Sequence, residues 1–117
     1  MSYTFKVNIT QEIIDRPGVN PNDRDACLCY TALKDAGYDV FAVDMTSVYF
    51  YHSPTSISSA SLPQEALDYL EPLMDLSNRR QGFYKAKREG ENYWRSVAEP
   101  FSYDLELPDE VQPVSKV

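Results

Sequence analysis

The chain has few of the residues that build metal sites and disulfide frameworks. Its 117 residues include two cysteines, Cys27 and Cys29, and one histidine, His52. Residues two positions apart point in different directions on a helix, and two cysteines are too few for a disulfide framework. Structural zinc normally takes four ligands, so we expect no metal site. We interpret the cysteines as small buried side chains on a helix.

Motifs for catalysis and for phosphate binding are missing as well. The sequence contains neither a Gly-x-Ser-x-Gly elbow nor the glycine-rich loops that bind nucleotides. Ser47, Ser53 and Asp44 lie near His52 in sequence, but a catalytic triad needs its three groups within mutual reach. We interpret His52 as a surface residue of a loop. We expect no catalytic residue, no cofactor and no enzyme activity.

The chain also lacks a long apolar run. No stretch approaches the roughly 18–20 apolar residues that a transmembrane helix needs. The N-terminus shows no basic region followed by an apolar stretch, so it does not resemble a secretory signal. We therefore expect a cytoplasmic protein without membrane contact. The apolar fraction of 43% is sufficient for one hydrophobic core.

Alternation of apolar and polar residues predicts the strands. It is clearest over 3–9 and over 101–107, where it is typical of half-buried strands. Residues 11–14 extend the first strand past a bend in this interpretation. Residues 38–51 contain two β-rich runs around a short polar break, which predicts a hairpin or one long bent strand. The serine-rich residues 52–61 are predicted to form a loop.

Helical spacing and capping residues predict two main helices. The first spans 23–36, with Asn22 or Asp23 as its N-cap. The second spans 63–76, and the residues that start it, from Ser61, resemble a capping box.

These elements predict an α+β fold in the order β-α-β-β-α-(insert)-β. A small antiparallel sheet of about four strands, with two main helices on one face, buries the apolar side of each element. We expect a single α+β domain over 1–107, in which 78–98 is a basic and aromatic insertion. The polar residues 108–117 are predicted to be a disordered tail.

Positive charge is concentrated in one part of an acidic protein. The net charge is −7, and the sequence pI is about 4.5. Residues 79–95 hold six of the eleven basic residues and two acidic ones, so they carry about +4. Their basic side chains alternate with Phe83, Tyr84, Tyr93 and Trp94. We call residues 79–95 the basic segment.

The basic segment has three interpretations. Arg, Tyr and Trp are enriched at protein-binding hot spots, which favours a protein partner. Lys and Arg also neutralise phosphates while aromatic rings stack on bases, but the acidity of the remaining chain disfavours nucleic acid. The third interpretation is a solvated polar helix whose Phe83 and Trp94 dock on the core. The side chains that we predict to contact a partner are Arg79, Arg80, Tyr84, Lys85, Lys87, Arg88, Trp94 and Arg95.

Three short motifs follow one another in an order that is typical of a family of small proteins. They are Cys27 followed by 32–37 (ALKDAG), then 62–70 (LPQEALDYL), then 100–105 (PFSYDL). In this order they resemble uncharacterised proteins encoded by bacteriophages and prophages. The motifs are mostly core and capping positions, so the resemblance implies a fold and no established activity.

The resemblance covers residues 5–76 and 99–107 and has two departures. Leu28 stands where the family often has proline. The family passes quickly from the second helix to the last strand, whereas here 78–98 intervene. Because this insertion carries the cationic cluster, we expect it to be the functional addition to a shared scaffold.

We therefore expect a non-enzymatic protein of phage or mobile-element origin that binds a host macromolecule in the host cytoplasm, as anti-defence proteins do. A host protein is the expected partner, and nucleic acid bound by the basic segment is the alternative. A homodimer is a further alternative, since the edge strand 3–9 or 101–107 would otherwise leave backbone groups free to pair with other chains.

A second version places the activity on the acidic body, which would mimic nucleic acid and occupy a basic groove. The carboxylates expected to matter in that version are those of Glu65, Asp68, Glu71, Asp104 and Glu106.

Overall fold

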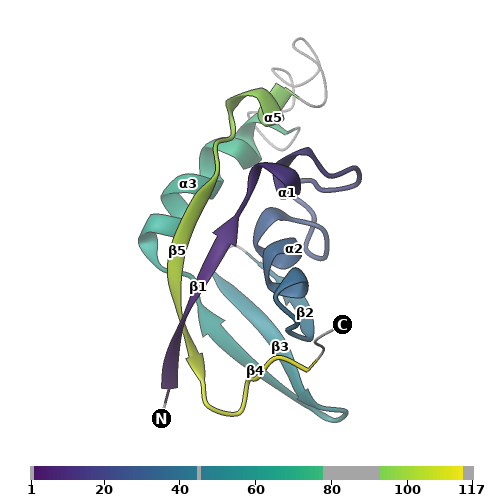
Figure 1. The fold of residues 1–117 in the computed structure, drawn as a ribbon, viewed down its shortest axis with the longest axis vertical. Coiled ribbons are helices and arrows are strands. Elements are labelled where there is room, and N and C mark those ends of the chain that lie inside the picture. The colour runs from purple at the N-terminus through teal and green to yellow at the C-terminus, as the bar shows by residue number, and fades with distance from the viewer. Residues whose placement is uncertain (1, 45, 78–92, 115–117) are drawn as a thin grey trace.

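The computed structural model describes residues 2–44, 46–77 and 93–114. Within these ranges, antiparallel strands form one sheet of two strands and one of three, and helices pack against both (Figure 1). The predicted α+β class is confirmed. The buried apolar residues of both sheets and of the helices join in one hydrophobic core.

The two-stranded sheet pairs an early strand with a late one. β1 (Ser2–Ile9) runs antiparallel to β5 (Phe101–Pro108) along the whole of both strands. The alternation in the sequence corresponds to burial, because Val7 and Leu105 face the core while Lys6 is exposed. Both predicted strands are therefore confirmed.

The three-stranded sheet contains a hairpin and one strand that was not predicted. β2 (Val40–Val43) pairs with β3 (Ser47–Ser53), which pairs in turn with β4 (Ser56–Ser61). The hairpin prediction over 38–51 is confirmed, but the predicted loop over 52–61 is wrong. Serine has little preference for strands by itself, and pairing with β3 overrides that weak local signal.

The chain after β1 turns into a short helix. α1 (Gln11–Asp15) begins after Thr10, whose Oγ1 accepts a hydrogen bond from the N–H of Ile13 at 3.2 Å. The predicted extension of the first strand over 11–14 is therefore wrong. The local cause is the N-cap, which satisfies a backbone donor that a strand would leave free.

The first main helix begins later than predicted. α2 (Leu28–Asp35) is capped by Cys27, whose Sγ accepts a hydrogen bond from the N–H of Tyr30 at 3.5 Å. The residues before it form turns, closed by a hydrogen bond from Asn20 N to the carbonyl of Ala26 at 3.0 Å. Neither Asn22 nor Asp23 is the N-cap.

The second main helix follows β4 almost directly. α3 (Gln64–Leu76) has Pro63 at its N-cap position, without a side-chain hydrogen bond. The predicted capping box is wrong, because Ser61 is the last residue of β4. α5 (Tyr93–Val97) precedes β5, and Tyr69 of α3 ties the two regions together by donating a hydrogen bond to the Glu99 carbonyl at 2.7 Å.

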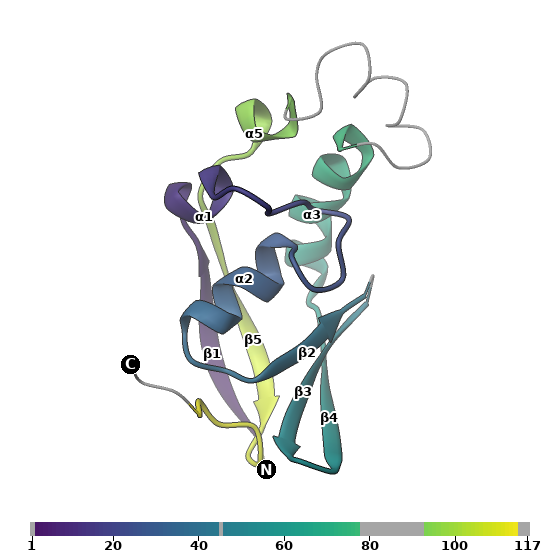
Figure 2. The same ribbon diagram turned by 90° about the vertical axis from the view of Figure 1, so that its right-hand side faces the viewer.

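Both main helices lie on the same side of the β1–β5 pair (Figures 1 and 2). α2 contacts both β1 of that pair and β2 of the three-stranded sheet. β4 also lies beside β5. The expected single sheet of about four strands is thus five strands in two sheets that face a common interior.

Residues 109–114 pack against the body, which differs from the predicted disordered tail. Val111 is buried, and its carbonyl accepts a hydrogen bond from the hydroxyl of Tyr3. The N–H of Val114 donates to the carbonyl of Gly37 at 2.8 Å. These contacts hold the segment across the C-terminal end of α2.

Candidate functional site

Most of the predicted contact residues lie outside the described part of the chain. These are Arg79, Arg80, Tyr84, Lys85, Lys87 and Arg88. The two that the structure places are Trp94 and Arg95, both in α5.

Trp94 and Arg95 are built into the fold. Trp94 is 1% exposed and belongs to the hydrophobic core, as the core-docking interpretation of this residue expects. The Arg95 guanidinium lies 4.9 Å from the Trp94 ring. It also donates hydrogen bonds to the carbonyls of Ile14, Arg16 and Val19 at 2.9, 3.0 and 3.0 Å. The carbonyl of Ile14 lies in the last turn of α1, and those of Arg16 and Val19 follow the helix, where backbone acceptors lack helical partners.

The other described flank of the basic segment is bound to the same region. Asn22 Nδ2 donates to the carbonyl of Met74 at 2.8 Å and to the hydroxyl of Ser77, which is buried. Ser77 and Arg95 therefore both contact residues 14–22. Residues 16–22 form a loop after α1 that contacts both the end of α3 and α5, and Pro21 and Asn22 of this loop line a cavity.

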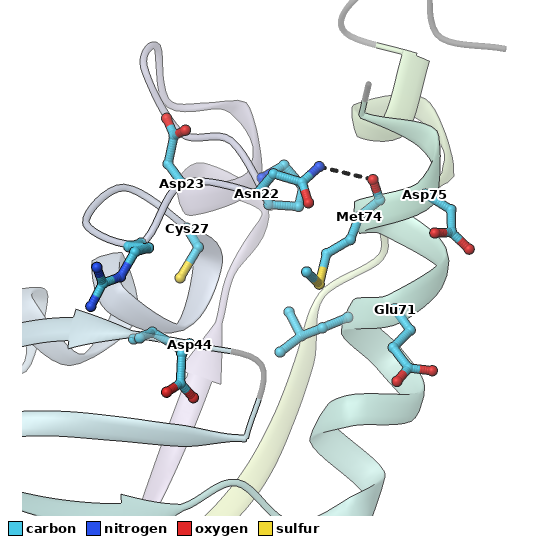
Figure 3. A pocket seen from close by; sticks show the side chains of 11 residues that line it. Asn22, Asp23, Cys27, Asp44, Glu71, Met74 and Asp75 are labelled. Carbon is cyan, nitrogen blue, oxygen red and sulfur yellow. Dashed lines mark hydrogen bonds between the residues drawn. The ribbon is translucent and has the colours of Figure 1, made fainter. Parts of the chain in front are cut away.

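The cavity has a volume of about 390 Å³ and lies between the 21–27 loop, the end of β2 and α3 (Figure 3). Its floor is apolar, formed by Cys27, Val43, Leu70 and Met74. In Figure 3 the sulfur atoms of Cys27 and Met74 point into the space between the loop and α3. We call this cavity the acid-rimmed pocket.

The rim of the pocket carries four carboxylates. They come from Asp23 on the loop, Asp44 after β2, and Glu71 and Asp75 on α3. Figure 3 shows that these carboxylates point apart rather than toward one point. Within the described ranges, no group of three or more His, Cys, Asp or Glu side chains is arranged to hold a metal ion. The rim therefore provides a diffuse negative field around an apolar floor.

Asp44 is fixed by its own turn. Its Oδ1 accepts hydrogen bonds from the N–H groups of Thr46 and Ser47 at 2.8 and 2.7 Å, and its Oδ2 accepts one from the hydroxyl of Tyr49 at 2.7 Å. The bond from Thr46 is the main cause of a lowered pKa for Asp44. The hydrogen bond to Asp44 raises the pKa of Tyr49. The carboxylate thus stays charged at neutral pH and ties the pocket rim to β3.

The thiols are poorly suited to nucleophilic chemistry. Burial raises the pKa of the Cys27 thiol to about 11, so the neutral form dominates near pH 7. Burial also raises the pKa of Cys29, whose Sγ accepts a hydrogen bond from the hydroxyl of Tyr103 at 3.0 Å. Cys27 contributes apolar surface to the pocket floor, and Cys29 belongs to the core.

The acidic side chains of β5 form a separate surface. Asp104 and Glu106 are exposed, and Lys6 of β1 lies directly opposite Asp104. The carboxylate of Glu106 accepts hydrogen bonds from the hydroxyls of Ser2 and Thr4 at 2.5 and 3.0 Å, and these bonds lower its pKa. Of the five carboxylates predicted to mimic nucleic acid, Glu71 lines the pocket, while these two lie on another face.

The sequence does not mark the residues of the pocket as a site. Asp23 is one of the two N-caps predicted for the first helix, and Leu70 and Met74 fall within the helix predicted over 63–76. Their meeting depends on how the 21–27 loop packs against α3, and contacts between distant segments leave no local pattern. The acidic composition of α3 was the available signal.

A scan of protein-family models, a search of curated proteins and a search of solved structures each found no match to this chain. The resemblance to phage proteins therefore stays a prediction. In the part of the chain that the structure describes, no helix has the length and apolar character needed to cross a membrane.

Proposed function

We propose that the protein is a non-catalytic binding protein whose acid-rimmed pocket receives a basic, partly apolar segment of another protein. The observation that carries this proposal is the pairing of an apolar floor with a rim of four carboxylates. An apolar side chain of the partner enters the pocket, and its basic neighbours face the rim.

The two parts of the pocket make different contributions to binding. Burial of one leucine-sized side chain contributes roughly 1.5–3 kcal/mol. Exposed ion pairs contribute less to affinity, typically about 0–1 kcal/mol each, and act more on encounter rate and selectivity. The net charge of −7 favours the approach of a basic partner over that of an acidic one.

This proposal agrees with the expected class of function, a non-enzymatic binding protein. It places the contact surface at the acid-rimmed pocket instead of the basic segment. A host protein as partner, a phage origin and an anti-defence role stay predictions from the sequence. Of the five carboxylates predicted to mimic nucleic acid, the proposal retains Glu71, which lies on the pocket rim beside an apolar floor. The carboxylates of Asp104 and Glu106 do not line the pocket. Glu106 accepts hydrogen bonds from hydroxyls of β1, and Asp104 lies opposite Lys6 of β1.

A second candidate is binding through the basic segment. The observation that favours it is the position of its flanks, since Ser77 and Arg95 both contact the loop that forms the pocket wall. If nucleic acid is the ligand, the logarithm of the affinity falls linearly with the logarithm of the salt concentration. A flat salt response removes nucleic acid as the ligand.

Affinity purification with three charge-reversed variants tests the proposal. The pocket variant changes Glu71 and Asp75 to Lys, and its matched control changes Asp104 and Glu106 to Lys on β5. The third variant changes basic residues of the basic segment to Glu, namely Arg79, Arg80, Lys85, Lys87 and Arg88.

We expect one protein partner to be recovered with the wild type and the β5 variant and lost with the pocket variant. Its loss with the third variant alone places the contact on the basic segment. Its loss with the β5 variant alone contradicts the proposal. Circular dichroism establishes that each variant is folded.

A further inference from the structure

The outward face of the three-stranded sheet carries large apolar side chains in contact with solvent. Phe41 of β2 is 43% exposed and Ile57 of β4 is 49% exposed. Tyr51 of β3 lies between them, because its ring centroid is 5.2 Å from that of Phe41 and its cross-strand partner is Ile57. We call Phe41, Tyr51 and Ile57 the outer apolar face. Contiguous apolar groups on a surface mark interaction sites more often than single exposed residues do.

The outer apolar face continues into the acid-rimmed pocket. Arg24 lines the pocket and also a second, more open cavity that is lined by Asp25, Phe41 and Ala42. The carbonyl of Arg24 accepts a hydrogen bond from the N–H of Val43 in β2 at 2.9 Å. Two successive residues of β2, Ala42 and Val43, therefore face the two cavities. The pocket and the outer apolar face thus meet at Arg24 and β2, and we take them together as one candidate surface.

We propose that this surface binds an extended basic segment of a partner protein at two apolar positions. One apolar side chain enters the acid-rimmed pocket, and a second lies against Phe41 and Tyr51. Lysine or arginine residues around them face Asp44, Glu71 and Asp75. The inference rests on the proposed function and adds a second anchor and a spacing to it.

The geometry of β2 sets the spacing. Phe41 lies in a register irregularity between Val40 and Ala42, and Val43 is two residues further on, so the two positions are at most about 7 Å apart along β2. In an extended partner, side chains at positions i and i+2 point to the same side at about this distance. Side chains at i and i+1 point to opposite sides, so adjacent apolar residues can occupy only one of the two positions.

A protein segment fits this surface better than the two other occupants that an exposed apolar face suggests. A second copy of the chain also carries a net charge of −7, which opposes association of the acidic rims. A nucleic acid brings phosphates to a surface where, among the described lining residues, five carboxylates accompany Arg24. Basic peptides have the complementary charge.

The experiment is a titration of the ¹⁵N-labelled full chain with defined peptides, followed by amide NMR signals up to millimolar peptide. The first peptide has lysines around two leucines placed at i and i+2. The second has the same composition with the leucines adjacent, and the third replaces both leucines by serine. A thymidine oligonucleotide is the fourth ligand.

We expect the first peptide to shift the signals of Phe41 and Met74 together and to bind several-fold more tightly than the second. Phe41→Thr should weaken the first peptide about tenfold and leave the second nearly unchanged. Val97→Thr is the matched control, because Val97 is 42% exposed on α5, outside the outer apolar face. It should leave binding unchanged.

Three results overturn the inference, and they separate it from the proposed function. If Phe41→Thr binds every peptide like the wild type while Glu71→Lys with Asp75→Lys abolishes binding, the second anchor is wrong and the pocket stands. If no peptide causes shifts at millimolar concentration, both fail. If the oligonucleotide alone shifts Phe41, the surface binds nucleic acid and both protein-binding proposals fail.

Discussion

The two sheets of this protein have similar inward faces and very different outward faces. On the β1–β5 pair, the outward residues are polar, and Thr4 and Ser2 satisfy Glu106 while Lys6 lies opposite Asp104. On the three-stranded sheet, Phe41 and the other residues of the outer apolar face are in contact with solvent.

The difference shows which side of the molecule is available for recognition. A polar face whose groups bind one another loses little by remaining in water. Large apolar side chains gathered over three strands gain free energy when a partner covers them, at roughly 25 cal/mol per Å² of buried apolar surface. The three-stranded sheet is also the one that adjoins the acid-rimmed pocket.

The largest expected effects concern the inward faces, where the two sheets should behave alike. Phe50→Ala in β3 and Leu105→Ala in β5 each remove a side chain that is 0% exposed. Each should lower the free energy of unfolding by about 3 kcal/mol, measured by urea denaturation. Two separate unfolding transitions, or a loss in one variant alone, would contradict a shared core.

The next effect tests whether Arg95 belongs to the fold. Arg95→Met keeps much of the side-chain volume but removes the donors to the carbonyls of Ile14, Arg16 and Val19. We expect a loss of about 2 kcal/mol in the free energy of unfolding. The control is Arg24→Met, a change on the exposed pocket rim that should cost less than about 0.5 kcal/mol. If both variants lose the same free energy of unfolding, the hydrogen bonds of Arg95 do not stabilise the fold.

Substitutions on the outward faces should separate stability from binding. Phe41→Thr on β2 removes the ring contact with Tyr51 and should lower the free energy of unfolding by about 1 kcal/mol, whereas Asp104→Ser on β5 should change it by less than about 0.5 kcal/mol. Binding of the basic peptide should weaken about tenfold in the first variant and stay unchanged in the second. A loss of peptide binding with Asp104→Ser would mean that the two outward faces do not differ in the proposed way.

The smallest effect compares the two thiols, one at the floor of the pocket and one in the core. Cys27 lines the pocket, whereas Cys29 contacts Tyr103 of β5 in the core. Burial raises the pKa of Cys27 to about 11, so its thiolate fraction, and with it the alkylation rate, should rise about tenfold per pH unit below that value. Mass spectrometry should find label at Cys27 before Cys29. Equal labelling would show that the pocket does not expose Cys27.

Local patterns predicted the elements better than their assembly. The alternation of apolar and polar residues located β1 and β5, because an antiparallel strand that is buried on one face places an apolar residue at every second position. The same rule missed β4, where Ser58 and Ser59 lack the apolar character of a strand and β3 provides the pairing. The sequence also could not indicate that Cys27, rather than Asp23, caps α2.

The candidate site was less predictable than the fold. Its floor joins Val43 with Leu70 and Met74, which are far apart in sequence and each look like ordinary core residues. The concentration of Arg and Lys in the basic segment is visible without a structure, but Trp94 and Arg95 turned out to serve the core and the end of α1. The alternation of charge and aromatic residues does not distinguish a side chain that binds a partner from one that holds the fold.

The central claim is that the protein meets its partner with the three-stranded sheet and the pocket beside it. Site-specific photocrosslinking tests this most directly, with a photoreactive phenylalanine analogue placed either at Phe41 or at Ser102 on the outward face of β5. We expect that one protein is crosslinked from position 41, that excess basic peptide suppresses this product, and that position 102 gives none. A product from position 102 alone, insensitive to the peptide, would contradict it.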